Sequence, residues 1–302
     1  MSTDAVLREL LVRQLDHWLP GALHRSRRAT LALAYAGADT GDAEAALRVV
    51  AEFADRLRGR RLTVLVLADG GAELPTRLGA AEAALPADVA VHVVPGHPDR
   101  LPVVLKAAGA AGAPLLAVVH GGAADPALLA AVATGRPAEL LLVTAPGRPA
   151  RPALTAAGFP LVTEVELIPT DGGPARLLAY ATGSDKSLEA LKDALWAVDE
   201  YAGVRYRDPA DPAGRLLAIT LEPEPGPLRR ELLAELTRSG PRTVAELRRF
   251  AATSTVYRAA DANRALTSLL ASGAVTREPE HGRLGGDVLI SLASPRDAGS
   301  SA

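Results

Sequence analysis

TLALAYAG at residues 30–37 and RLTVLVLAD at residues 61–69 are two short apolar runs, and DAEAALRVVAEFADRLRG lies between them at residues 42–59. The middle segment keeps its apolar residues on one face of a helix and most of its charged residues on the other. Each flanking run is apolar at most positions, as in a strand that is buried on both faces. A strand, a helix and a second strand in this order predict a parallel βαβ unit with a right-handed connection.

The same alternation continues along the chain. Three further apolar runs follow, at residues 89–96, 114–121 and 139–146, and segments of helical period separate them. Together, the five runs and their crossover helices predict an α/β fold with a doubly wound, Rossmann-like and mostly parallel sheet.

The pattern changes after residue 160. LVTEVELIP (161–169) and ARLLAYATG (175–183) flank the turn sequence Asp171-Gly172-Gly173, which predicts an antiparallel hairpin. A helix follows, with Ser184 as its N-cap. Many Rossmann-like methyltransferases combine a parallel sheet with an antiparallel hairpin, so we expect a methyltransferase-type fold.

A small second domain is predicted after a proline-rich segment. RLLAITLE (215–222) has the character of a strand, and EPEPGP (222–227) that of a stiff linker. Three helical segments follow, the first starting at Pro227, and then a closing hairpin, which is the order of a winged helix. We therefore expect a Rossmann-like methyltransferase-type domain with an N-terminal helix at 1–222, a winged-helix domain at 223–292 and a disordered tail at 293–302.

The composition excludes several kinds of chemistry. No residue is Cys, which excludes disulfides, thiolate metal sites, iron–sulfur clusters and thiol nucleophiles, and which fits a cytoplasmic protein. Only 3% of the residues are aromatic, which argues against binding of single strands by base stacking. AVLRELLVRQLDHWLP at residues 5–20 is interrupted by charges, so we expect a soluble helix that packs on the first domain, and no membrane segment.

Several motifs are similar to those of a known family. They are Leu15, Trp18 and Leu19 in the first helix, Tyr35-Ala36-Gly37 after the first strand, the helix Ser187–Trp196, and the segment Leu247–Gly273. In sequence and order they resemble the three-Cys-motif partner family, in which a methyltransferase-like Rossmann body precedes a C-terminal winged helix. The resemblance covers most of the chain and implies a divergent member.

The most specific match is the helix that carries Lys192 and Trp196, which resembles the family's Met-Lys-x-x-Met-Trp sequence. We expect Lys192 to be a solvated helix charge and Trp196 to pack under the hairpin. The cysteines of the family name belong to a partner protein, so the resemblance implies a protein partner. It also makes S-adenosylmethionine the candidate cofactor, although the residues themselves assign no cofactor.

The chain departs from the family at both ligand loops. In the family's first loop an acidic residue precedes Phe-Ala-Gly and Pro-Gly follows; here Leu33 takes the acidic position and Ala38-Asp39 replaces Pro-Gly. Glycine at such a loop lets the backbone approach a cofactor closely, and an acid holds its polar groups. The fourth strand ends in Val119-His120-Gly121-Gly122 where the family has an Asp-Pro-Phe-Gly-like sequence. Both loops have therefore lost ligand groups.

The candidate cofactor-binding residues are few. Asp69, at the end of the second strand, sits where a methyltransferase carboxylate holds ribose hydroxyls; the alternative is a solvated strand terminus or a helix cap. The loop before the helix at Asp42 is a candidate anion nest, although its glycine spacing matches no phosphate fingerprint. The residues that we assign to cofactor binding are Tyr35, Gly37, Asp39, Gly41 and Asp69.

His120 is the candidate catalytic residue, because it ends a strand and two glycines follow it. A histidine at this place can act as a base or as a phosphate partner. The alternative is a loop histidine that satisfies local hydrogen bonds. His92 and His97 lack a third ligand, so we expect no metal site.

Arginines mark the candidate nucleic-acid or partner surface. Arg258 and Arg264 lie on the third predicted helix of the second domain, and Arg277 and Arg283 lie in its hairpin. Such side chains contact phosphates in DNA-binding domains. Acidic residues lie beside them, so a surface that binds protein is an equal alternative.

These observations favour a catalytically degenerate scaffold whose winged helix binds a partner protein or nucleic acid. The first alternative is an active S-adenosylmethionine-dependent methyltransferase with altered motifs, built on Asp69, Asp39 and His120. The second is a DNA-binding regulator whose Rossmann body senses a metabolite.

Overall fold

The structure is a computed structural model and describes residues 2–37, 41–69, 73–199 and 201–293. The chain divides into two compact units, Met1–Ile219 and Thr220–Ala302. The division falls close to the predicted boundary between residues 222 and 223. The predicted tail, 293–302, lies outside the described residues except for Ala293.

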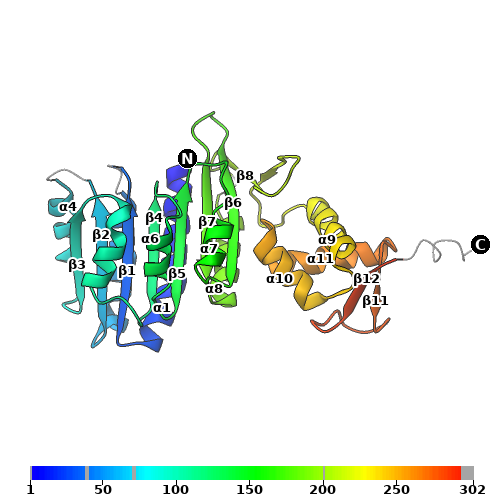
Figure 1. Cartoon of the computed structure of the whole chain (residues 1–302), viewed down its shortest axis with the longest axis horizontal. Coiled ribbons are helices and arrows are strands. Elements are labelled where there is room, and N and C mark those ends of the chain that lie inside the picture. Colours follow the sequence, from blue (N-terminus) through cyan, green and yellow to red (C-terminus); the bar gives the residue numbers. More distant parts are fainter. Residues whose placement is uncertain (1, 38–40, 70–72, 200, 294–302) are drawn as a thin grey trace, which may run out of the picture. The chain divides into compact units, whose positions relative to one another are not determined.

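The larger unit is built on a nine-stranded sheet (Figure 1). Its strands are β1 (Arg28–Tyr35), β2 (Arg61–Ala68), β3 (Val89–Pro95), β4 (Leu115–His120), β5 (Ala138–Thr144), β6 (Leu161–Pro169), β7 (Arg176–Thr182), β8 (Val204–Arg207) and β9 (Leu216–Ala218). They lie in the order β3-β2-β1-β4-β5-β7-β6-β8-β9. β3, β2, β1, β4 and β5 run parallel, and each later strand is antiparallel to its neighbours.

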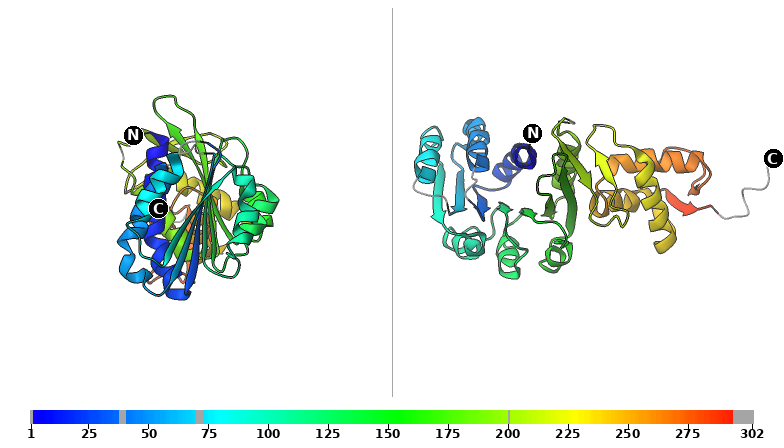
Figure 2. Two further views of the ribbon diagram at one scale, coloured as in Figure 1. Left: turned by 90° about the vertical axis from the view of Figure 1, so that its left-hand side faces the viewer. Right: turned by 90° about the horizontal axis from the view of Figure 1, so that it is seen from above.

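Helices cover both faces of this sheet, as Figure 2 shows. They are α1 (Thr3–Arg25), α2 (Gly41–Glu52), α3 (Ala54–Leu57), α4 (Glu73–Glu82), the short 3₁₀ helix η1 (Pro98–Arg100), α5 (Leu101–Ala107), α6 (Pro126–Val132), α7 (Arg151–Ala156) and α8 (Asp185–Trp196). α4, α2, α1 and α8 pack in a row on one face, and α5, α6 and α7 pack in a row on the other. The predicted Rossmann-like α/β fold is confirmed.

The apolar pattern explains most of these elements. The five runs predicted as buried strands form β1 to β5, and the predicted hairpin forms β6 and β7. In α1, which was predicted to pack on the first domain, one helical face is buried; it carries Leu7, Leu11, Leu15 and Trp18. Within the described residues, no helix has the length and apolar character that a membrane span requires.

A buried polar cluster fixes α1 and α8 to the sheet. The Glu139 carboxylate on β5 accepts hydrogen bonds from Gln14 Nε2 at 3.0 Å, Tyr180 Oη at 2.6 Å and Ser187 Oγ at 2.8 Å. The four residues come from α1, β5, β7 and α8, so the cluster joins two helices to two strands. Burial raises the pKa of the Tyr180 phenol well above its ordinary value, and the Glu139 charge adds to this effect.

The antiparallel end of the sheet differs from the prediction. β8 was not predicted, because a run of four residues gives too weak a pattern, although Val204 and Tyr206 are buried in the expected alternation. The predicted strand at 215–222 is wrong in length, since β9 spans only Leu216–Ala218.

The smaller unit contains α9 (Pro225–Ser239), β10 (Arg242–Thr243), α10 (Val244–Ser254), α11 (Ala259–Ala271), β11 (Val275–Glu278) and β12 (Leu289–Leu292). Its antiparallel sheet has the order β10-β12-β11, so the predicted hairpin gains a short third strand. α9 starts at Pro225, inside the predicted linker 222–227. The linker prediction is wrong there because proline is well tolerated in the first turn of a helix, where its missing N–H has no partner to lose.

Candidate functional site

The strand order of the larger unit reverses between β1 and β4. In open α/β sheets, ligands bind outside the carboxyl ends of the strands at such a reversal. β1 ends at Tyr35 and β4 ends at His120, and these two residues are paired in the sheet register. Asp69 follows the end of the neighbouring strand β2. The structure therefore brings three of the predicted site residues to one edge of the sheet, which we call the rim.

Several described side chains and backbone groups lie close together at the point of reversal. The rings of Tyr35 and His120 lie 6.1 Å apart between centroids and are tilted by 60°. Tyr35 is 1% exposed, and His120 is half-buried at the end of a strand rather than in a loop. The Ala36 N–H donates to the His120 carbonyl at 2.9 Å, so the two strands stay paired beyond their ends. This hydrogen bond keeps β1 and β4 together at their carboxyl ends.

The two glycines after His120 serve close packing between loops. Gly121 has φ of +77°, and a Cβ built on it would lie 3.0 Å from the Ala36 Cβ. A Cβ on Gly122 would lie 2.8 Å from Val119 Cγ1 and 3.3 Å from the Pro98 Cβ. The absence of these side chains lets neighbouring parts of the protein approach each other. That space is therefore used by the protein itself.

Asp69 is already bound by a protein group. Its Oδ2 lies 2.8 Å from His97 Nε2, and the two side chains are 53% and 58% exposed. A cofactor hydroxyl would have to compete with this imidazole for the carboxylate. The sequence contained a signal for the contact, because Asp69 and His97 each follow one of two adjacent parallel strands, whose carboxyl ends meet at the same edge.

The structure describes the predicted anion nest of the first loop only in part. Asp39 lies outside the described residues, and Gly37 is exposed, with no atom within 4 Å of a Cβ built on it. Gly41 opens α2, whose first turn carries Asp42 and Glu44. Negative charge in the first turn complements the helix dipole, and Arg8 and Arg77 form ion pairs with Asp42 and Glu44 at 3.1 Å and 2.5 Å. Leu33 is fully buried in the core.

Lys192 and Trp196 lie away from the rim, on α8. The prediction that Lys192 is solvated is wrong, because the side chain is 1% exposed. Burial raises the pKa of nearby Asp208, and the charge of Lys192 acts against that shift. Trp196 is buried edge-on against Tyr206 of β8, with ring centroids 5.6 Å apart. Both motif residues thus hold α8 against the antiparallel strands.

Arg258 and Arg264 of the smaller unit share one buried carboxylate. Asp261, which is 4% exposed, accepts hydrogen bonds from Arg258 Nε at 2.9 Å and from Arg264 Nη2 at 2.7 Å. Burial by itself acts to raise the pKa of Asp261, but the hydrogen bonds from the two arginines leave it below its ordinary value. Both guanidinium groups are therefore partly neutralised inside the protein.

The two arginines of the hairpin differ from each other. Arg277 donates to the carbonyls of Pro279, Gly282 and Arg283 at 2.9–3.1 Å and so holds the connection between β11 and β12. Arg283 is exposed, and its side chain makes no hydrogen bond or ion pair within the described part of the chain. Of the four predicted surface cations, Arg283 has the most freedom to contact a partner.

The rim thus combines a Tyr–His contact, closely packed glycine loops and a carboxylate that is bound by histidine. Residues 2–37, 41–69, 73–199 and 201–293 contain no cluster of His, Asp or Glu that could hold a metal ion. No protein-family model and no curated protein matches this chain.

Proposed function

We propose that the protein is a catalytically degenerate scaffold of the methyltransferase type, similar to three-Cys-motif partner proteins, whose C-terminal winged helix binds a partner protein. The strand order supports the methyltransferase comparison, because five parallel strands are followed by an antiparallel hairpin. The helices and strands of the smaller unit support the winged helix, because three helices precede an antiparallel hairpin that a short strand extends.

The close packing of the described groups at the point of reversal is the observation that carries the scaffold proposal. A dinucleotide or nucleoside cofactor needs glycine backbone and open space at this point. Here Tyr35 is buried, Ala36 is hydrogen-bonded to His120, and Gly121 packs on Ala36.

The exposed face of α11 favours protein over nucleic acid as the partner. A helix that reads the major groove presents several side chains that donate hydrogen bonds to bases and phosphates. The exposed residues of α11 are small or neutral apart from Arg264, which is already bound to Asp261; they are Ala260, Arg264, Thr267 and Ala271.

Calorimetric titration of the full chain with S-adenosylmethionine tests the scaffold proposal. We expect no heat of binding up to about 1 mM cofactor, which corresponds to less than roughly 4 kcal/mol of binding free energy. Saturable binding in the micromolar range would overturn the proposal. A circular dichroism spectrum of an α/β protein on the same sample shows that the chain is folded.

An active methyltransferase is the second candidate, and Asp69 at the end of β2 favours it. In that case the parent protein binds the cofactor, and Asp69→Ala abolishes binding while the protein stays folded. His97→Ala distinguishes the two candidates further. In an enzyme, this substitution releases the Asp69 carboxylate and tightens cofactor binding. In a scaffold, the variant still binds no cofactor.

A further inference from the structure

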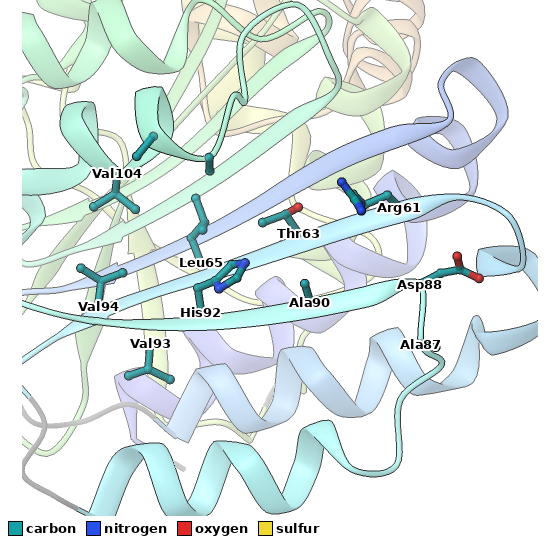
Figure 3. Close-up of a pocket in the computed structure, with 12 residues that line it drawn as sticks. Arg61, Thr63, Leu65, Ala87, Asp88, Ala90, His92, Val93, Val94 and Val104 are labelled. Carbon is teal, nitrogen blue, oxygen red and sulfur yellow. The ribbon is translucent and has the colours of Figure 1, made fainter.

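The larger unit has an open groove on the face that carries α5 (Figure 3). Its floor is formed by Arg61, Thr63 and Leu65 of β2 and by Ala90, His92 and Val94 of β3. α5 is only seven residues long and buries Leu101 and Leu105, so the outer part of the sheet beside it stays uncovered. The cavity volume is about 710 Å³, which is within the usual range for small-molecule sites.

We propose that this groove binds a small anion with an apolar body, of the class of medium-chain carboxylic acids. The carboxylate would lie at Arg61 and Thr63, and the apolar chain would run along Leu65 toward Val94 and Val104. The groove is separate from the rim, so this inference does not depend on the scaffold proposal.

The polar end of the groove carries the guanidinium group of Arg61, which is available to bind a ligand. Within the described residues the Arg61 side chain makes no hydrogen bond or ion pair, whereas its sheet neighbour Arg28 donates to the carbonyls of Gly109 and Ala111. The one acid in the lining, Asp88, accepts from the Gly59 N–H at 3.1 Å. The guanidinium charge is therefore available to an anion.

The other end of the groove is apolar. Figure 3 shows Val94 and Val104 facing each other from β3 and α5, with Leu65 and His92 between them and the polar end. Residues 63 and 90 and residues 65 and 92 are register partners, so their side chains stand on the same face of the sheet. A ligand along the groove meets a charged end first and aliphatic walls beyond it.

The edge of β3 argues against a partner strand as the occupant. The Gly96 N–H donates to the Ala68 carbonyl of β2. The backbone groups of the alternate residues therefore point away from β2, toward the free edge; these residues are Val89, Val91, Val93 and Pro95. The Val89 N–H donates to Pro86, the Val91 N–H donates to Glu82 Oε1 at 3.1 Å, and Pro95 has no N–H. An added strand would find few donors, which leaves the groove beside the edge to a small ligand.

Calorimetric titration of the full chain with octanoate tests the proposal, with octanol as a neutral comparison. We expect one octanoate per chain. Arg61→Gln should weaken octanoate binding at least about tenfold, because it removes a charge-assisted hydrogen bond. Ala90→Trp should abolish binding by filling the groove. The matched control is Arg48→Gln, which removes an exposed arginine from α2 on the opposite face and should leave the affinity unchanged.

Absence of saturable octanoate binding overturns the proposal, as does equal affinity in the parent and in Arg61→Gln. Sedimentation velocity adds a second readout. A dimer of the parent chain that dissociates in Ala90→Trp would assign the groove to a second copy and would likewise overturn it. If Ala90→Trp does not fold, as judged by circular dichroism, Val94→Phe fills the apolar end instead.

Discussion

Asp261 shows how one residue can determine the role of several cations. It lies in the first turn of α11 and accepts hydrogen bonds from Arg258 and Arg264. The Arg258 N–H also donates to it at 3.0 Å, which satisfies the start of the helix. From the sequence these arginines looked available for phosphate. Asp261, three residues from each, is the signal that they also have a local partner.

We expect Asp261→Asn to lower the free energy of unfolding of the smaller unit by about 2–3 kcal/mol at pH 7, because two guanidinium groups lose a buried anion. The folded-state pKa of Asp261 lies below its ordinary value. The stabilisation is therefore complete above the unfolded-state pKa, and it is lost as the pH falls through the folded-state pKa. The difference between parent and variant should shrink below about pH 4.

Hydrogen exchange of α11 amides in the full chain measures this difference. The control is Glu222→Gln, since Glu222 is exposed and lies 3.7 Å from Arg264. That change should cost less than about 0.5 kcal/mol. A loss for Asp261→Asn that is the same at pH 7 and at pH 3 would contradict the electrostatic explanation.

At the scale of elements, β3 is the exposed edge of the parallel part of the sheet, and α4 protects it. Glu82, the last residue of α4, accepts the Val91 N–H at 3.1 Å. Unsatisfied donors along an edge strand invite pairing with another chain, and an inward-reaching charge is one means of preventing it. The carboxylate thus both satisfies the donor and places charge at the edge.

We expect Glu82→Ala to make the chain self-associate, because the Val91 N–H loses its acceptor and can then donate to a carbonyl of another strand. Sedimentation velocity over a range of protein concentrations measures the change, with a dimer expected in the variant at concentrations where the parent sediments as a smaller species. Glu73→Ala removes an exposed charge from the other end of α4 and is the matched control. Equal sedimentation of the two variants would argue that Glu82 has no such role.

How far the sequence predicts an element depends on its length and on which contacts define it. The strands β1 to β7 were predictable because each is an apolar run or a half of a clear hairpin. β10 has two residues and pairs with β12 near the chain end, so no local pattern could reveal it. The burial of Lys192 also had no local signal, because its charged neighbour Asp208 lies beyond β8. At the rim, residues 35, 69 and 120 were predictable as neighbours, but the occupation of Asp69 by His97 was not predicted.

At the scale of the whole molecule, the net charge of the second unit depends on where that unit begins. Residues 227–302 contain 11 Arg and 8 acidic residues. The compact unit begins at Thr220, so it also contains Glu222 and Glu224, and its balance becomes 11 against 10. A unit that is close to neutral lacks the electrostatic attraction that provides most non-specific binding to DNA.

We therefore expect the full chain not to bind duplex DNA at physiological salt. Fluorescence anisotropy with a labelled duplex of about 20 base pairs measures this, and a fall in ionic strength to roughly 50 mM should give at most weak binding, because few phosphates can be neutralised. Arg283→Ala should remove that residual binding, since Arg283 is exposed and its side chain makes no hydrogen bond or ion pair within the described residues. Arg277→Ala is the comparison variant, because the Arg277 guanidinium donates to three carbonyls of the hairpin.

Submicromolar affinity for the duplex at physiological salt, with a steep salt dependence, would instead support a DNA-binding regulator. The partner of the second unit would then be nucleic acid rather than protein.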